Sequence, residues 1–325
     1  MDHAAGSAGP DEFALIRRLG AILGRPGAEV VEGIGDDCAL LSPDLVWSLD
    51  LLVEDVHFRR STSSLDDIGW KALAVNLSDL AACAAEPIAA LVGLALGPGA
   101  AEADAERLYV GLAACAGAYG CPVVGGDVSR GPALALAVTV LGRSQRPLRR
   151  STARPGDLVC VTGELGGSEA GRLVLEGAAP APAEADALAE RHRRPRPRLA
   201  EAAALREIAS AGLDVSDGVA SDARRLAEAS SVIVAIDLDA LPVQAGVAAV
   251  AGAVGLSPTI FAATGGEDYE LLVTVAADAV GSAGCALTPI GRIEAGAARV
   301  RFEGAGARAD LAGFDHLAVR ARAGS

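Results

Sequence analysis

The stretch at 71–82, KALAVNLSDLAA, carries polar side chains in a segment that is otherwise apolar on nearly every side. It belongs to a helix that we predict over 66–85, because Pro87 disfavours helical geometry just beyond it. Asn76 and Asp79 stand three residues apart and share one face of that helix. A carboxylate surrounded by leucine, alanine and valine is costly without a partner. We therefore predict that this face has a functional role.

Short aspartate motifs also lie outward from this helix, in both directions along the chain. They are GIGDD at 33–37, SLD at 48–50, GGD at 125–127, DVSDG at 214–218 and GGED at 265–268. Each lies at the edge of an apolar segment, and most are flanked by glycine or serine. Carboxylates brought together in a fold repel one another unless cations lie between them. The pattern predicts a site for several magnesium ions, and therefore for a polyphosphate.

Two of these motifs have a simpler interpretation. Asp217 would be the N-cap of a helix that starts at Gly218, although this leaves Asp214 unexplained. Asp127, after two glycines, would belong to a turn, but the same glycines would let backbone amides approach a phosphate. Both interpretations stay open at this point.

Composition limits the classes of protein. The 325 residues give room for two domains, and 51% apolar with 22% charged residues is typical of a soluble globular protein. The net charge of −14 argues against nucleic acid or an anionic membrane surface as a partner. The longest apolar runs are about half of the ~20 residues that a membrane helix needs. Six scattered cysteines without a CxxC pair, and no secretory signal, favour reduced thiols in the cytoplasm.

The common nucleotide-binding motifs are excluded. A P-loop requires Gly-Lys-Ser/Thr, but Lys71, the single lysine, stands between Trp70 and Ala72. The GELGG turn at 163–167 lacks the GxGxxG spacing of a Rossmann turn. His57 and Lys71 each have a structural or surface interpretation, and the HRRPRPR run at 192–198, which contains His192, has the composition of an exposed basic face.

Strands and helices alternate in both halves of the chain. We predict helices at 11–23, 66–85, 101–119, 168–175, 199–209 and 219–229, and strands at 38–41, 45–49, 88–96, 122–124, 133–141, 157–162, 232–238, 269–275, 287–293 and 299–302. The Arg-, Pro- and Ser-rich stretch at 143–156 marks a boundary. The prediction is two α+β domains, at 11–148 and 149–320.

The sequence resembles the thiamine-monophosphate kinase family, which shares a superfamily with aminoimidazole ribonucleotide synthetase, selenophosphate synthetase and a hydrogenase-maturation enzyme. The motifs that carry the resemblance occur in the family's order and spacing over nearly the whole chain. They are GIGDDCALL at 33–41, LxxDVHF at 52–58, KALAVNLSDLAA at 71–82, GGDxxRGP at 125–132, VTGxLGxSxxG at 161–171, DVSDG at 214–218 and GGEDYELL at 265–272.

The resemblance implies roles for particular residues. Positions that hold magnesium around the ATP phosphates match Asp36, Ser48, Asp50, Asp79, Asp127, Asp214 and Asp217. Nucleotide contacts match Gly126, Asp127, Arg150 and Ser216, and contacts to thiamine phosphate match His57, Glu267 and Phe314. Leu49, Asp55 and Leu317 depart from the family pattern, where threonine, glycine and phenylalanine are usual.

The implied reaction is direct transfer of the ATP γ-phosphoryl group to thiamine monophosphate. The acceptor is already anionic at neutral pH, since a phosphate monoester has a second pKa of about 6, so no catalytic base is expected. Seven candidate ligands imply roughly two to four Mg²⁺ ions. The resemblance also implies a fold like that of aminoimidazole ribonucleotide synthetase and a homodimer in which the N-terminal domains pair their sheets.

Other functions remain as alternatives. Residues 1–30 lack the reactive cysteine of selenophosphate synthetase, and the end of the chain lacks the cysteine of the hydrogenase-maturation enzyme. An ATP-dependent cyclo-ligase of the aminoimidazole ribonucleotide synthetase type is the second candidate. An acidic metal-binding domain without turnover is the third, although it would need neither the GGED motif nor glycine-flanked phosphate loops.

Overall fold

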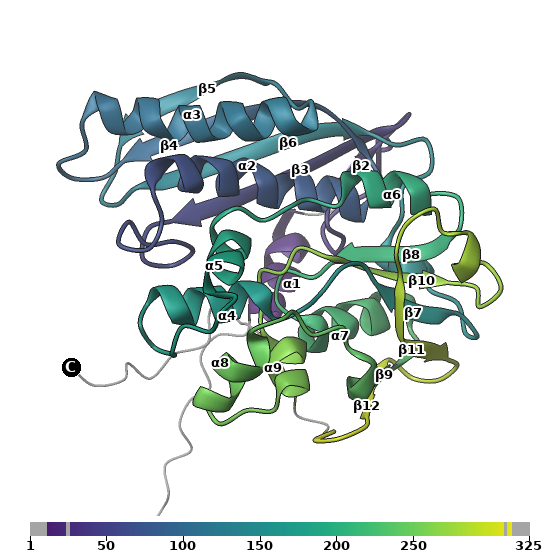
Figure 1. Ribbon diagram of the computed structural model, residues 1–325. Helices are drawn as coiled ribbons and strands as arrows, with labels where there is room; N and C mark the ends of the chain where they lie inside the picture. Colours follow the sequence, from purple (N-terminus) through teal and green to yellow (C-terminus); the bar gives the residue numbers. More distant parts are fainter. Residues whose placement is uncertain (1–11, 24–26, 309–310, 314–325) are drawn as a thin grey trace, which may run out of the picture.

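Two six-stranded β-sheets organise the chain, one in each half (Figure 1). The computed structural model describes residues 12–23, 27–308 and 311–313. Both halves mix strands with helices, so the predicted α+β class is confirmed. The predicted boundary after residue 148 falls in the connection between the two sheets.

The first sheet has the strand order β1-β2-β3-β6-β4-β5. Its strands are β1 (Val30–Glu32), β2 (Ala39–Leu41), β3 (Leu45–Val53), β4 (Glu86–Leu96), β5 (Val123–Arg130) and β6 (Ala135–Arg143). Neighbours are antiparallel except β4 and β5, which run parallel and are joined through helix α3 (Glu102–Tyr119). Helices α2 (Leu65–Ala82) and α3 cover one face of this sheet (Figure 1).

The second sheet has the order β12-β9-β11-β7-β10-β8, in which only β12 and β9 are parallel. Its strands are β7 (Leu158–Val161), β8 (Ala209–Asp214), β9 (Ile233–Asp237), β10 (Leu271–Val275), β11 (Thr288–Glu294) and β12 (Arg299–Glu303). The remaining helices are α1 (Glu12–Leu23), α4 (Gly167–Leu175), α5 (Ala185–Arg193), α6 (Leu199–Leu205), α7 (Val219–Ser230), α8 (Val247–Ala253) and α9 (Pro258–Thr264), with 3₁₀ turns η1 (Arg150–Thr152), η2 (Leu238–Ala240) and η3 (Val280–Ser282). Strands β1 and β8 and helices α5, α8 and α9 were not among the predicted elements.

Helix α2 is apolar on nearly every side because it is packed between the two halves. It lies on β3 and β6 of its own sheet and contacts α6 and β8 of the second half. Ser64 caps its N-terminus, since its hydroxyl accepts a hydrogen bond from the Asp67 amide while Asp67 accepts one in return. The predicted end at residue 85 was three residues too late. A shared apolar cluster, which includes Ala82 and Leu271, continues from this helix into the second half.

The GGD motif differs from its predicted place at a strand end. Strand β5 continues through Gly125, Gly126 and Asp127 to Arg130 and pairs with β4 along this length. Gly126 has a φ of 155°, and a Cβ there would lie 1.9 Å from the Val92 carbonyl oxygen. Glycine therefore lets β5 approach β4 closely, and the turn interpretation of Asp127 is wrong.

The face of the first sheet opposite α2 and α3 carries exposed apolar side chains. Trp47, Leu49 and Leu51 alternate outward along β3 and are 49%, 62% and 49% exposed. Leu91 of β4 lies on the same face, because Leu49 and Leu91 both pair with Thr139 of β6. Four large apolar side chains therefore lie about half-exposed on one face of the sheet.

The arginine-rich run after His192 holds the two halves together. Arg193 donates to the Thr62 carbonyl oxygen at 2.6 Å. Arg194 contacts Asp67 at 2.6 Å and lies 5.5 Å from the centre of the Trp70 ring. The interpretation of this run as an exposed basic face is wrong for these side chains, because each has a partner in the first half.

Of the described helices, none alone has the length and apolar composition needed to cross a membrane. Helices α8 and α9 meet that test only together, as a pair bent by 94°.

Candidate active site

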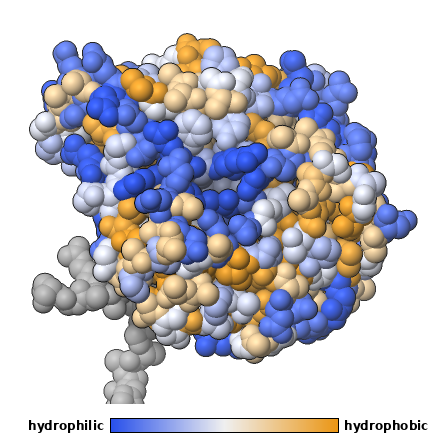
Figure 2. Space-filling model, in the orientation of Figure 1, coloured by the Kyte–Doolittle hydropathy of each residue, from blue (hydrophilic) through white to orange (hydrophobic). Residues whose placement is uncertain are grey.

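A cleft of about 890 Å³ lies between the two halves, and residues of both line it. Figure 2 shows hydrophilic residues around a hollow between the halves. The cleft brings together ten of the predicted site residues. They are Asp36, Ser48, Asp50, His57, Asp79, Arg150, Asp214, Ser216, Asp217 and Glu267.

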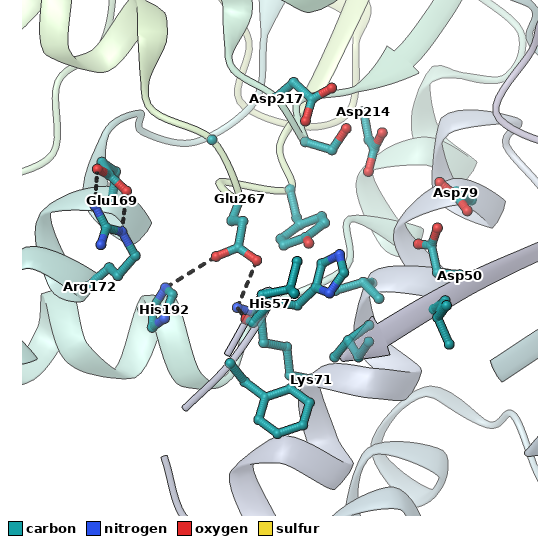
Figure 3. A pocket seen from close by; sticks show the side chains of 18 of the residues that line it. Asp50, His57, Lys71, Asp79, Glu169, Arg172, His192, Asp214, Asp217 and Glu267 are labelled. Atoms are coloured by element: carbon teal, nitrogen blue, oxygen red, sulfur yellow. Dashed lines mark hydrogen bonds and ion pairs between the residues drawn. The ribbon is translucent and has the colours of Figure 1, made fainter. Parts of the chain in front are cut away.

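Carboxylates gather at one end of the cleft (Figure 3). Asp50 lies on β3, Asp79 on α2 and Asp214 at the end of β8. Oxygen atoms of Asp37, Asp79 and Asp214 all lie within 4.8 Å of one another. Residues separated by more than 170 positions are thus brought into one group by the packing of α2 against β8.

Neighbouring polar side chains fix the orientation of these carboxylates. The hydroxyl of Ser48 donates to Asp79 at 2.5 Å, and that of Ser78 donates to Asp214 at 2.6 Å. The buried Asn76 does not join the group, and its side-chain oxygen accepts a hydrogen bond from the Asp50 amide at 2.9 Å. The polar face predicted on this helix therefore supplies one carboxylate and one positioning amide.

Arg150 binds both aspartates of the GIGDD motif. Its guanidinium contacts the two oxygens of Asp37 at 2.9 and 2.5 Å, and its backbone amide donates to Asp36 at 3.1 Å. The side chains of Asp36 and Asp37 are only 3% and 1% exposed. Sequence reasoning selected Asp36 and missed Asp37, although the adjacent carboxyl was present in the motif.

Asp217 does not cap the following helix. The N-cap of α7 is Gly218, and no side chain caps it. The Asp217 carboxylate instead accepts a hydrogen bond from Arg225, which also contacts the buried Asp222 at 3.0 Å. The N-cap interpretation of Asp217 is therefore wrong.

Among the described residues, carboxylates outnumber cations at this end of the cleft, where Arg150 and Arg225 pair with four aspartates and two further aspartates lie close by. Burial, followed by repulsion from Asp37, raises the pKa of Asp36 to about 7 and that of Asp214 to about 7. Burial, with Asp50 and Asp214 nearby, raises the pKa of Asp79 well above its usual range. Bound cations would reverse these shifts by favouring the ionised form.

The donor set fits hard divalent cations. Carboxylate oxygens are the ligands preferred by Mg²⁺, which takes one or two from the protein and completes its shell with water and substrate oxygens. Asp37, Asp79 and Asp214 supply such oxygens at close range, and Asp50 and Asp217 line the same cleft.

A second group of ionisable side chains occupies the other end of the cleft (Figure 3). One carboxylate oxygen of Glu267 lies 2.8 Å from the Lys71 ammonium nitrogen, and the other lies 3.3 Å from Nδ1 of His192. Burial alone would raise the pKa of Glu267, but Lys71 and then His192 outweigh it and hold the pKa well below its usual range. Glu267 is therefore ionised at neutral pH.

The orientation of His57 follows from one backbone contact. Its Nδ1 accepts a hydrogen bond from the Val53 amide at 3.0 Å. This contact assigns Nδ1 as the acceptor, so the neutral ring carries its proton on Nε2. The side chain lies between the acidic group and Lys71 (Figure 3).

Two of the predicted residues that the structure describes, Gly126 and Asp127, do not line the cleft. Gly126 and Asp127 lie on β5, at the edge of the first sheet. Asp127 is level with Gly93 and Ala137, whereas Asp50 is level with Val138, so the two aspartates point to opposite faces of the sheet. Three strand steps separate them, roughly 14 Å at the usual spacing. Phe314 lies outside the described residues.

Lys71, Asp37, His192 and Arg225 line the cleft but were not predicted as site residues. For Lys71 the available signal was a lone cation near an apolar helix face. His192 gave none, because its local sequence is dominated by arginine.

Comparison with known families matches both halves. Residues 35–144 match the AIR synthase related protein N-terminal domain, and residues 154–302 match the corresponding C-terminal domain. The thiamine-monophosphate kinase of Salmonella typhimurium is 40% identical over 95% of this chain and 98% of its own length. That of Mycobacterium tuberculosis is 37% identical over 93% and 92%, respectively.

Solved structures agree with the sequence relatives. The structure named "AaThiL complexed with AMPPCP and TMP" matches with a TM-score of 0.84 and 33% identity, over 94% of this chain and 97% of that one. The thiamine-monophosphate kinase from Stenotrophomonas maltophilia matches with a TM-score of 0.73 and 40% identity, over 90% and 96%. The fold expected from the resemblance is therefore confirmed, and the chain belongs to the thiamine-monophosphate kinase family, whose two halves are AIR synthase related domains.

Proposed function

We propose that this protein transfers the γ-phosphoryl group of ATP to thiamine monophosphate, giving thiamine diphosphate and ADP. The observation that carries the proposal is the two-ended cleft. Its acidic end suits a metal-bound polyphosphate, and its other end presents Lys71, Glu267 and His57 to a second substrate. Relatives named thiamine-monophosphate kinase, and a structural relative in complex with AMPPCP and TMP, support the same pairing of substrates.

We propose that the acidic end holds several Mg²⁺ ions. Asp36, Asp37, Asp79 and Asp214 are the central ligands, with Ser48, Asp50 and Asp217 beside them. When bound, magnesium neutralises phosphate charge and lets two anionic phosphates approach each other. This neutralisation matters the more because the chain itself carries a net charge of −14.

The residues of the chain act by alignment. The acceptor phosphate is already ionised at neutral pH, so its attack needs no base. His57 lines the cleft with its proton on Nε2, and Arg150 adds positive charge beside the nucleotide phosphates. Ser216, between Asp214 and Asp217, faces the same region of the cleft. Holding donor and acceptor in line supplies the rate enhancement.

We also propose that the active form is a homodimer joined through the first sheet. The exposed face with Trp47, Leu49, Leu51 and Leu91 is the kind of surface that a second copy covers. Within one chain, Gly126 and Asp127 lie too far from Asp50 to bind the same metal ion or nucleotide. A second chain would bring its own Gly126 and Asp127 to this nucleotide site, which retains their roles as nucleotide and metal contacts. Phe314 keeps its proposed role in contacting the thiamine phosphate, and the proposed compartment is the cytoplasm.

The test is ADP release from ATP and magnesium, with and without thiamine monophosphate. The proposal expects release that depends on thiamine monophosphate and yields thiamine diphosphate. Release that requires formylglycinamidine ribonucleotide instead would support the cyclo-ligase. Cation binding without turnover of either acceptor would support an acidic metal-binding domain.

A further inference from the structure

Lys71 is the single lysine of the chain, and it is almost fully buried. Lys71 lies on α2, and the residue is 3% exposed. Its ammonium nitrogen lies 2.8 Å from Glu267 and donates to the backbone carbonyl oxygen of His57 at 3.3 Å (Figure 3). One cation of the first half therefore contacts both cleft segments that carry predicted acceptor contacts.

The two segments held by Lys71 share an unusual backbone conformation. Asp55, two residues before His57, has a φ of 64°, and Glu267 also has a φ of 64°. Side-chain-bearing residues rarely adopt this region, and they do so where surrounding contacts hold them. Lys71 supplies such a contact to each segment.

The geometry suits an ammonium group better than a guanidinium. A lysine head group is compact and directs three donors to separate acceptors, whereas arginine presents a flat fork that fits one carboxylate edge. The other 27 cationic residues of the chain are arginines, and the lysine stands where a compact ammonium group contacts two segments of the cleft.

We propose that Lys71 is a positioning residue for the phosphoryl acceptor. It holds Glu267 ionised and in place, and it fixes the His57 segment against the second half of the cleft. This inference rests on the proposed function, because it assigns the Lys71 end of the cleft to thiamine monophosphate rather than to the nucleotide.

The test compares Lys71→Met and Lys71→Arg with the wild type. We expect Lys71→Met to raise the KM for thiamine monophosphate by at least about ten-fold, because it leaves Glu267 without its ammonium partner. The KM for ATP should stay within about two-fold of the wild-type value. Lys71→Arg should not restore the acceptor KM, since the fork cannot reach both acceptors in a closed site.

Arg198 provides a control in the second half of the chain. Arg198 contacts the fully buried Glu270, three residues from Glu267, but does not line the cleft. Arg198→Met removes one cationic partner of a glutamate, as Lys71→Met does, while Arg191 still contacts Glu270, and it should leave the acceptor KM unchanged. Equal changes in acceptor KM for the two variants would reduce Lys71 to a structural role and overturn the proposal.

A measurement on the unmodified chain keeps the proposal testable if Lys71→Met does not fold. Because Lys71 is the single lysine, labelling lysine with ¹³C at Cε alone gives one resonance, next to the ammonium group. Thiamine monophosphate alone should shift this resonance, and a magnesium–nucleotide complex alone should leave it near its original position. A resonance that responds only to nucleotide would overturn the proposal. Failure of the proposed function is distinguishable, because the wild type would then show neither a shift with thiamine monophosphate nor acceptor-dependent ADP release.

Discussion

At the residue scale, the acidic group is a place where function opposes stability. Asp79 shares a small volume with Asp37 and Asp214, and its pKa is raised by burial and by neighbouring carboxylates. Asp79→Asn removes one charge but keeps an oxygen to accept the Ser48 hydrogen bond. In the presence of a chelator, we expect this variant to melt about 2–4 °C above the wild type. Turnover should fall by about a thousand-fold or more, because a proposed metal ligand is lost.

Thermal denaturation with and without magnesium checks this prediction. Magnesium should raise the melting temperature of the wild type by mass action, and it should raise that of Asp79→Asn by less. An Asp79→Asn variant that is less stable than the wild type in chelator, and equally stabilised by magnesium, would contradict it.

His192 gives a second prediction at this scale. Burial and then Lys71 lower its pKa, outweighing Glu267, while Arg172 acts in the same direction as Lys71. As the pH falls through about 6.5, the unfolded chain takes up a proton that the folded chain does not, so stability is lost on acidification. His192→Gln removes this contribution. Between about pH 7.5 and about pH 5.5, the wild type should lose up to about 1.4 kcal/mol more unfolding free energy than the variant.

Urea denaturation at both pH values measures the difference. Other groups that titrate in this range affect both proteins, so they cancel when the two pH-dependent changes are subtracted. Identical changes in the two proteins would show that His192 is protonated equally in the folded and unfolded chains.

At the scale of the element, the contact between α2 and α3 depends on two glycines. A Cβ at Gly111 of α3 would lie 1.9 Å from the Asp66 carbonyl oxygen, and one at Gly69 of α2 would lie 2.0 Å from that of Leu108. Gly111→Ala must therefore separate the helices, and we expect it to destabilise the protein by about 2–3 kcal/mol.

Gly117, on the same helix, is the matched control. A Cβ there would meet nothing within 4 Å. Alanine has the higher helix propensity, so Gly117→Ala should stabilise the protein by up to about 1 kcal/mol. The sign of the free-energy change should thus differ between two identical substitutions six residues apart. Destabilisation by both would mean that the helix, and not its packing, responds to the substitution.

At the scale of the whole molecule, the proposed dimer predicts sharing of sites between chains. If Asp127 completes the site of a second chain, Asp50→Asn and Asp127→Asn should each abolish turnover alone. Mixed dimers of the two variants contain one site with both aspartates intact. Random mixing should then restore about a quarter of wild-type turnover. If both residues serve one site in one chain, mixing restores nothing, so turnover after unfolding and refolding the mixture decides between the two arrangements.

The sequence was sufficient for those parts of the molecule that local patterns determine. The apolar residues on nearly every side of α2 predicted a buried helix whose polar residues have a functional role, and Asp79 lies in the cleft as that argument requires. The end of β5 could not be predicted, because Gly125 and Gly126 are turn residues by composition. Only the neighbouring β4 backbone turns them into a closely paired strand.

The contacts between Lys71, Glu267 and His192 lay beyond sequence reasoning for a related reason. Lys71 belongs to the first half, His192 to α5 and Glu267 to the loop before β10, so only the packing of the two halves brings these three side chains together. The GIGDD motif predicted an acidic site, but the choice between Asp36 and Asp37 required the position of Arg150.

The two tryptophans of the chain lie at two different surfaces, the sheet face of the proposed dimer and the contact between the two halves. Trp47 lies half-exposed on the open sheet face, while Trp70 donates to the Pro195 carbonyl oxygen at 3.1 Å, beneath Arg194. Their fluorescence therefore reports separate events. In a Trp70→Phe chain, the proposed dimer predicts that the emission of Trp47 shifts to the blue when a second chain removes water from it. In a Trp47→Phe chain, the emission of Trp70 should shift to the red when the two halves separate. The wavelength of the emission maximum therefore distinguishes dissociation of the proposed dimer from separation of the halves.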